Sequence, residues 1–271
     1  MKKIKLIFPL LQLLFTKPSV LLKALYHAVI NQNRRDHVIN KYGLKDGLPE
    51  VNFLDVFSSF NGEVNTHSLL YGTSMPIDMA VLVEFAKRFN ECDYLEIGTW
   101  RGESLVNVAP HCNSCVSVSL SDDEMKQFGF NEKYVLVQRF FSKDLKNVKH
   151  IGANSRTFDF HSLNQKFDLI FVDGDHSYDG VLSDTKKVFE LLKNENSIIV
   201  WHDCVAQYEI PDFEVVGGIL DGAPADKRNK IFHLTNTLCA VYMNKSFKTK
   251  TPDFPAVPDK KFEMTIRAEK I

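Results

Sequence analysis

The 271-residue sequence lacks the features that define several protein classes. Its five cysteines are an odd number in a chain too long to need disulfide staples, which favours a reducing, cytoplasmic setting. Lysine and arginine (33) do not exceed aspartate and glutamate (34), so we expect no nucleic-acid partner. Because 44% of the residues are hydrophobic, the composition predicts an ordered protein with one large domain or a domain with an appended lobe.

Several catalytic and membrane motifs are also missing. The sequence has no phosphate-binding P-loop, no G-x-S-x-G nucleophile elbow and no H-E-x-x-H zinc helix, which removes the usual support for an NTPase or a hydrolase. The apolar run from Ile4 to Phe15 is interrupted by charged and polar residues and is shorter than the ~20 residues that a bilayer-spanning helix needs. A transmembrane anchor is therefore disfavoured, and no small-x-small cleavage site follows the run.

Charge is unevenly distributed along the chain. Residues 1–35 contain seven lysines and arginines and no acidic residue, which predicts a separate helical extension over residues 1–35. A helix over Pro18–Ile30 would place apolar side chains at helical spacing. We expect it to pack on the body of the protein or on a partner subunit of a homo-oligomer. Peripheral membrane contact through residues 1–30 is the alternative.

The rest of the chain divides into a loop-rich cap (36–75), a main domain (76–244) and a surface tail (245–271). In the main domain, strands alternate with helices, which predicts an α/β fold with a doubly wound, mainly parallel sheet covered on both faces. The predicted helices are residues 76–89 and Tyr178–Lys193. The predicted strands are Tyr94–Ile97, Cys115–Leu120, Tyr134–Gln138, Phe167–Val172, Ser197–Trp201, and a final antiparallel pair at Ile231–Leu234 and Cys239–Met243.

Ligands of such sheets bind beyond the carboxyl ends of the strands, so the residues that follow each strand carry the most information. The first strand is followed by YLEIGTWRGES, in which Glu96, Gly98 and Gly102 form an E-x-G-x-x-x-G pattern. Gly98 permits a tight turn and a close backbone approach to a ligand. A dinucleotide fingerprint would need a second glycine at position 100, where this chain has Trp100. NAD is thus disfavoured, and a ligand without phosphates is favoured.

This motif resembles the first motif of class I S-adenosylmethionine-dependent methyltransferases. The segments FDLIFVDGDHSYDGVLSDTKKVFELL and SIIVWHDC resemble the fourth and fifth strands of methyltransferase family 24, a small-molecule O-methyltransferase group that is also similar to cephalosporin-hydroxylase-type proteins. The resemblance covers roughly residues 76–244. It implies a seven-stranded Rossmann-like methyltransferase sheet with an antiparallel final strand, and S-adenosylmethionine as cofactor.

The resemblance also implies which residues bind the cofactor. Glu96, Gly98, Thr99 and Gly102 would line its methionine part. At the end of the second strand the family usually has an acid for the ribose hydroxyls; here Ser119 stands at that position and Asp122 lies slightly beyond it. Asn154 and Ser155 resemble residues of the adenine-side loop. Asp173 follows the fourth strand and completes the predicted set.

Acidic residues and histidines also follow the fourth and fifth strands. Asp173 and Asp175 come after one, and His202 and Asp203 after the other, so neighbouring strands would bring them to one crevice. Carboxylates suit Mg²⁺ or another divalent cation. By resemblance to metal-dependent relatives, the predicted metal ligands are Asp173, His202 and Asp203. Without a metal, Asp173 and Asp203 would orient the substrate or His176.

Methyl transfer to a hydroxyl requires an aligned acceptor oxygen and a route for its proton. His176 is the candidate base, with Asp203 as the second catalytic residue. Alternatively, His176 caps the helix that begins near Tyr178. By family analogy, the sequence predicts an enzyme of EC type 2.1.1 that methylates a hydroxyl of a small molecule or sugar unit. The alternative is a non-catalytic or diverged, hydroxylase-like protein that serves as a cofactor-binding or membrane-peripheral interaction module.

Overall fold

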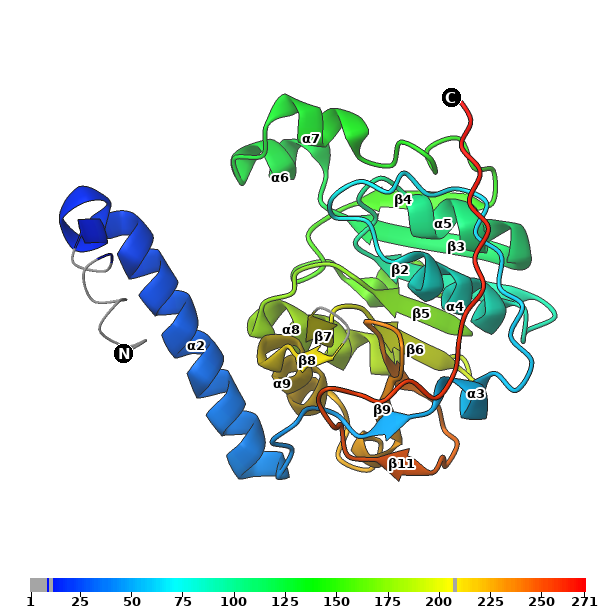
Figure 1. Ribbon diagram of the computed structural model, residues 1–271. Coiled ribbons are helices and arrows are strands. Elements are labelled where there is room, and N and C mark those ends of the chain that lie inside the picture. Colours follow the sequence, from blue (N-terminus) through cyan, green and yellow to red (C-terminus); the bar gives the residue numbers. More distant parts are fainter. Residues whose placement is uncertain (1–8, 10–11, 207–208) are drawn as a thin grey trace.

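The computed structural model describes residue 9, residues 12–206 and residues 209–271 (Figure 1). Its helices are α2 (Pro18–Tyr42), α3 (Phe53–Val56), α4 (Pro76–Ala86), α5 (Glu103–Val108), α6 (Asp122–Gln127), α7 (Glu132–Val137), α8 (Tyr178–Glu190) and α9 (Phe213–Gly222). Its strands are β1 (Glu50–Val51), β2 (Cys92–Ile97), β3 (Cys112–Ser119), β4 (Val148–Gly152), β5 (Leu169–Val172), β6 (Ile198–Trp201), β7 (Val205–Ala206), β8 (Ile210–Pro211), β9 (Ile231–Leu234), β10 (Ala240–Tyr242) and β11 (Thr249–Lys250).

The main sheet has the strand order β11-β1-β9-β10-β6-β5-β2-β3-β4. Strands β4, β3, β2, β5 and β6 are mutually parallel, and β10 is antiparallel to both β6 and β9. This confirms the predicted mainly parallel sheet with an antiparallel final strand. The described residues form nine strands in it rather than seven, because the cap adds β1 beside β9 and the tail adds β11 beside β1, each of two residues.

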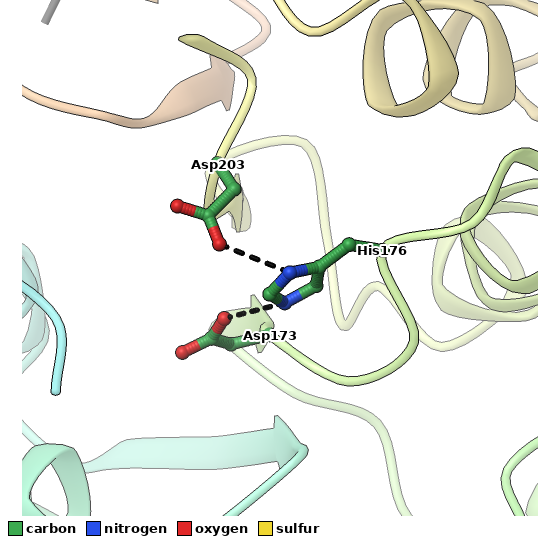
Figure 2. A group of neighbouring side chains, drawn as sticks. All are labelled: Asp173, His176 and Asp203. Carbon is green, nitrogen blue, oxygen red and sulfur yellow. Dashed lines mark hydrogen bonds and ion pairs between the residues drawn. The ribbon is translucent and has the colours of Figure 1, made fainter. Parts of the chain in front are cut away.

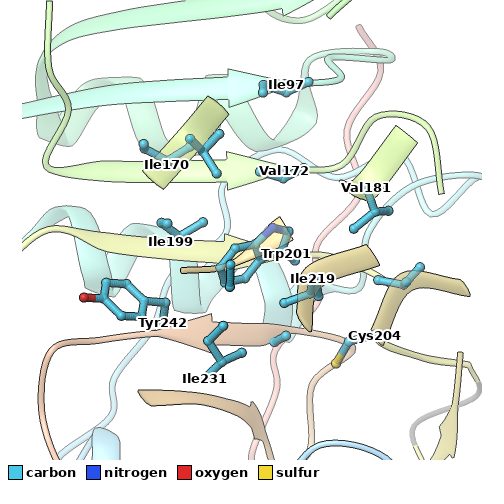
Figure 3. Packing of buried hydrophobic residues seen from close by; sticks show 14 of the residues in the cluster. Ile97, Ile170, Val172, Val181, Ile199, Trp201, Cys204, Ile219, Ile231 and Tyr242 are labelled. Atoms are coloured by element: carbon cyan, nitrogen blue, oxygen red, sulfur yellow. The ribbon is translucent and has the colours of Figure 1, made fainter. Parts of the chain in front are cut away.

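Two hydrophobic clusters cover the two faces of the sheet. On one face, strand side chains pack against α8, α9 and the C-terminal half of α2. On the other face they pack against α3, α4 and α5. Figure 3 shows Trp201 in the first cluster, among Ile199, Val181 and Ile219. Its indole Nε1 donates a hydrogen bond to Thr185 Oγ1 at 3.0 Å, so the buried ring leaves no unpaired donor.

The predicted strand Tyr134–Gln138 is wrong, because this segment forms helix α7. Asn131 caps the helix by accepting a hydrogen bond from the Tyr134 amide at 3.1 Å. Leu136 is 79% exposed, so the apolar run is not covered by a neighbouring layer. The edge position next to β3 belongs instead to β4, whose mixed polar sequence VKHIG gave no apolar signal.

Helix α2 continues well beyond Ile30, through Arg35, and ends at Gly43. The expectation that its apolar side chains at positions 20–29 pack on the body is wrong: Val20, Leu25 and Val29 are each more than half exposed. Figure 1 shows the N-terminal half of α2 projecting away from the sheet. The predicted apolar run Ile4–Phe15 lies largely outside the described residues. Within the described part of the chain, no helix combines the length and apolarity needed to cross a bilayer.

One carboxylate fastens the C-terminal half of α2 to α9. Asp221 accepts hydrogen bonds from His37 Nε2 and Lys41 Nζ, both at 2.7 Å, and from the hydroxyls of Tyr42 and Tyr178. Burial works to raise the pKa of Asp221, but these four donors outweigh it and hold the pKa well below its ordinary value. The ionised carboxylate is therefore the form that stabilises the contact between α2 and α9.

We predict that Asp221→Asn destabilises the protein by about 2 kcal/mol, the cost of losing hydrogen bonds to a buried charge. Urea unfolding at neutral pH measures the loss. Because the folded-state pKa of Asp221 is depressed, its contribution is present above the unfolded pKa of about 4 and disappears as the pH falls below it. Asp226→Asn, at an exposed ion pair with Lys227, is the matched control and should change stability little.

Candidate active site

The loop after β2 touches the loop after β5 through backbone atoms. Gly98 has a φ of +91°, and a Cβ placed on it would lie 2.0 Å from the carbonyl oxygen of Asp173. Only glycine fits this position, because any side chain would force the two loops apart. The close backbone approach at Gly98 is thus to another loop of the protein, whereas the approach to a ligand stays a prediction.

Two buried polar atoms beside this loop lack hydrogen-bond partners among the described residues: Glu96 Oε1 and Trp100 Nε1. The other oxygen of Glu96 accepts a hydrogen bond from Tyr94 at 2.7 Å. Trp100 has a φ of +45°, a strained value for a residue with a side chain, and its ring lies 5.0 Å from that of Tyr134 in α7. Unpaired buried polar atoms and backbone strain gather at ligand sites, so this loop is suited to a polar ligand.

Complete burial raises the pKa of Glu96 to about 8, and the nearby charge of Asp173 acts in the same direction. Glu96 is therefore largely protonated at neutral pH.

The remaining predicted cofactor residues lie along the same edge of the sheet. Thr99 is buried and its hydroxyl contacts that of Ser117. Ser119 ends β3, and Asp122 opens α6 with its carboxylate 2.9 Å from Arg139 Nη2. Asn154 follows β4, and its side chain accepts a hydrogen bond from the Arg156 amide at 3.0 Å. Ser155 accepts a hydrogen bond from Lys187 through its backbone oxygen.

Asp173, His176, His202 and Asp203 converge beyond the ends of β5 and β6. Figure 2 shows the His176 ring between two carboxylates: Nε2 lies 3.2 Å from Asp173 Oδ1 and Nδ1 lies 3.1 Å from Asp203 Oδ2. His202 Nδ1 lies 3.3 Å from Asp173 Oδ1 and 3.2 Å from Asp203 Oδ1. Asp203 adopts a left-handed backbone conformation with φ +57°. Two histidines and two aspartates thus form one compact cluster.

A fifth member of this cluster, Asp78 in α4, was not identified from the sequence. It is fully buried, and its Oδ2 lies 3.1 Å from His202 Nε2. The amides of Met75 and Leu238 donate to the same carboxylate at 3.2 and 3.0 Å. Asp78 therefore fixes the ring of His202 so that Nδ1 faces Asp173 and Asp203. The available signal was an acidic residue among the apolar positions of PIDMAVLVEFA, since a charge on a buried helix face needs a partner.

The buried carboxylates and imidazoles change one another's pKa values. Burial alone would lower the pKa of His202, but the charge and hydrogen bonds of Asp173, with Asp203 and Asp78, raise it well above its usual range. The hydrogen bond to Asp173 raises the pKa of His176. Burial would raise the pKa of Asp173, but His202 and His176 hold it well below its ordinary value. The contacts within the cluster thus raise the pKa values of its histidines and lower that of Asp173.

The donor atoms of this cluster fit a divalent cation. One ligand atom each from Asp173, His176 and Asp203 lies within 4.8 Å of the others, so the group that converges contains His176 where the sequence predicted His202. His202 Nδ1 is buried and has no hydrogen bond of good geometry among the described residues, although both carboxylates are near. Mixed nitrogen and oxygen donors suit transition metals such as Mn²⁺ better than they suit Mg²⁺.

Helix capping does not explain His176. Ser177 is the N-cap of α8, where its hydroxyl accepts a hydrogen bond from the Gly180 amide at 3.3 Å. The ring of His176 points instead towards the two carboxylates (Figure 2).

The cap residues 65–74 lie against the first loop and α5. Glu103 accepts hydrogen bonds from the Ser68 amide at 2.6 Å and the Thr73 hydroxyl at 2.8 Å, and Arg101 Nε lies 3.2 Å from the same carboxylate. Ser74 directly follows Thr73 of this buried network, and its hydroxyl donates a hydrogen bond to Asp173 Oδ2 at 3.3 Å. The cap thus reaches the cluster directly.

A separate cleft of about 430 Å³, between α2 and the tail, contains none of the predicted site residues.

Residues 95–204 match the family described as a methyltransferase domain, family 24. The matched segment begins in β2 and includes the Gly98 loop and every member of the cluster except Asp78. This part of the chain is therefore similar to a class I methyltransferase domain, which confirms the resemblance of the motifs. No curated protein matches the chain in sequence.

Solved structures with a similar arrangement include three methyltransferases. An SAH-bound methyltransferase of Podospora anserina shares 20% identity over 64% of this chain and 80% of its own, with a TM-score of 0.47. A putative O-methyltransferase of Klebsiella pneumoniae shares 15% identity over 65% and 84% of the two chains, with a TM-score of 0.42. An O-methyltransferase of Bacillus cereus shares 12% identity over 77% and 89%, with a TM-score of 0.41.

We predict that Asp78→Asn lowers stability by about 3 kcal/mol, because it leaves the buried His202 without its anchoring carboxylate. Thermal unfolding measures the change. Asp123→Asn makes the same substitution at a side chain that is 90% exposed and is the control. Equal effects of the two substitutions would contradict the role of Asp78.

A second prediction concerns Glu96. Its folded-state pKa of about 8 exceeds the unfolded value of 4.5, so the unfolded state ionises first as the pH rises. Stability should therefore fall between about pH 4.5 and 8, and Glu96→Gln should flatten this part of the profile. Urea unfolding of both proteins across this range is the measurement. Parallel profiles would show that Glu96 is not protonated in the folded state.

Proposed function

We propose that the protein is an S-adenosylmethionine-dependent O-methyltransferase that acts on a hydroxyl of a small molecule or sugar unit. The observation that carries this proposal is the cluster of His176, Asp173 and Asp203 beside the Gly98 loop of a methyltransferase domain. The choice of a sugar or other small molecule rests on the family resemblance.

In this proposal the cofactor binds along the edge formed by the ends of β2, β3 and β4. Glu96, Gly98, Thr99 and Gly102 hold its methionine part, and the unpaired Glu96 Oε1 supports a polar ligand there. Ser119 and Asp122 are the ribose-side residues, and Asn154 and Ser155 the adenine-side residues. Asp173 lies between this proposed cofactor site and the side chains of His176 and Asp203.

When bound, S-adenosylmethionine supplies an electrophilic methyl group on a sulfonium sulfur. The carbon–sulfur bond breaks as the carbon bonds to the acceptor oxygen, and S-adenosylhomocysteine leaves with the electron pair of the broken bond. His176 accepts the proton of the acceptor hydroxyl, and the flanking carboxylates of Asp173 and Asp203 stabilise the resulting imidazolium. These residues also hold the ring in place, so the acceptor oxygen is positioned as well as deprotonated.

A divalent cation would be held by Asp173, His202 and Asp203. There it would supply positive charge that stabilises an acceptor alkoxide. This part of the proposal is supported by the donor atoms of Asp173, His176 and Asp203 that lie within 4.8 Å of one another, and by the buried Nδ1 of His202 within 3.3 Å of both carboxylates.

The first experiment is calorimetric titration of S-adenosylmethionine and S-adenosylhomocysteine into the purified protein, with Mg²⁺ or Mn²⁺ and after EDTA treatment. Gly98 is a poor position for a blocking variant, because any side chain there strikes Asp173. Ser119 is better suited, since it is partly exposed at the end of β3. Ser119→Asp introduces a carboxylate for the ribose hydroxyls and should tighten binding about tenfold, whereas Ser119→Leu should weaken it.

Activity is tested by transfer of a radiolabelled methyl group to a panel of nucleotide sugars and phenols, followed by mass analysis. His176→Ala should reduce turnover about a hundredfold and leave cofactor affinity unchanged, since the base acts only on the acceptor. His161→Ala, at an exposed ion pair with Glu190, is the control. A folded protein that binds neither cofactor form would favour the non-catalytic alternative, and a product that gains oxygen instead of methyl would favour a hydroxylase-like activity.

A further inference from the structure

The N-terminal half of α2 exposes a series of large apolar side chains. Val20, Leu22, Leu25, Tyr26 and Val29 are each at least 53% exposed, and Leu14 and Phe15 just before the helix are exposed as well. Single exposed apolar residues are common, but a contiguous group of this kind marks an interaction surface.

These side chains are segregated on the helix. Leu22, Leu25, Tyr26 and Val29 follow the i, i+3, i+4, i+7 spacing of one helical face. Lys23, His27 and Asn31 follow the i, i+4, i+8 spacing, which places them together on another face, where Val20 also lies. The projecting part of α2 therefore has one continuous apolar face and an opposite face that is mainly polar.

Contacts made by the C-terminal half of α2 hold the helix on the body, and the N-terminal half extends outward. Asp221 binds His37 and Lys41, and the Arg34 guanidinium lies 3.7 Å from the centroid of the Tyr178 ring. Figure 1 shows the segment before these contacts extending away from α8 and α9. The exposed fractions show that no described segment of this chain covers the apolar face.

Charge distinguishes between the possible occupants of this face. Residues 1–35 contain seven basic residues, and the first acidic residue of the chain is Asp36. A second copy docked here would bring two wholly basic segments together, with no carboxylate on either to compensate them. An anionic lipid surface supplies both an apolar layer for Leu22, Leu25 and Val29 and negative charge for the lysines and arginines.

We propose that α2 lies on an anionic membrane surface, with its Leu22–Leu25–Val29 face inserted at the boundary between headgroups and acyl chains. This proposal is independent of the reaction that the domain catalyses. It describes a peripheral contact, in keeping with the absence of a membrane-crossing helix from the described part of the chain.

Co-sedimentation of the full chain with vesicles tests the proposal. We expect binding to phosphatidylcholine vesicles that contain phosphatidylglycerol, little binding to phosphatidylcholine alone, and weaker binding at high salt. The double variant Leu25→Gln with Val29→Gln should reduce binding about tenfold, because two inserted apolar side chains are lost. The matched control, His27→Gln with Asn31→Gln, changes two exposed residues away from the apolar face and should alter binding less than about twofold.

All the substituted side chains are exposed, so the variants should retain the circular dichroism spectrum and unfolding midpoint of the parent protein. Equal binding to both kinds of vesicle would overturn the proposal, and so would an equal loss of vesicle binding in the two double variants. Light scattering without vesicles gives the third outcome: a dimer that Leu25→Gln with Val29→Gln dissociates would assign the face to a second copy of the chain instead.

Discussion

The candidate active site depends on the burial of charge at the ends of β5 and β6. His202 is almost completely buried, and Asp78, Asp173 and Asp203 all lie within 3.3 Å of its ring nitrogens. Removing one of these carboxylates would take a polar partner away from a ring that water barely reaches. The strands bring the charges together, and the charges in turn restrict how the surrounding elements pack.

Three elements from different parts of the chain are tied to this cluster. Asp78 links α4 to His202 and to the amide of Leu238, just before β10. Ser74 brings the cap to Asp173, and Gly98 brings the first loop to the same residue. The cap and the cofactor loop are thus positioned relative to the acidic cluster by direct contacts, which makes the site more rigid than a set of independent loops would be.

The sequence predicted the parts of this arrangement that have strong local signals. Apolar runs located β2, β3, β5 and β6, and the side chains just after β5 and β6 do converge, as parallel strands require. Local sequence patterns gave the wrong secondary structure where contacts with distant residues determine it. VKHIG has no apolar periodicity but is β4, and the capped run that contains Leu136 is a helix. Asp78 was missed because its partner, His202, lies 124 positions away in the sequence. The apolar pattern of α2 predicted a helix at this position, but it could not specify whether anything covers its apolar side chains, which are exposed in this chain.

The contact at Gly98 also limits how ligands can reach the site. The loop that would hold the cofactor and the loop that carries Asp173 meet backbone to backbone, so neither can swing open without displacing the other. Together they form the fixed rim of the site. Movement that admits a cofactor or an acceptor is therefore expected on the side of α6 and α7, where Phe128 and Leu136 are largely exposed, rather than at the cap, which a buried hydrogen-bond network fixes. Entry from that side would let the chain exchange ligands while the acidic cluster keeps its geometry.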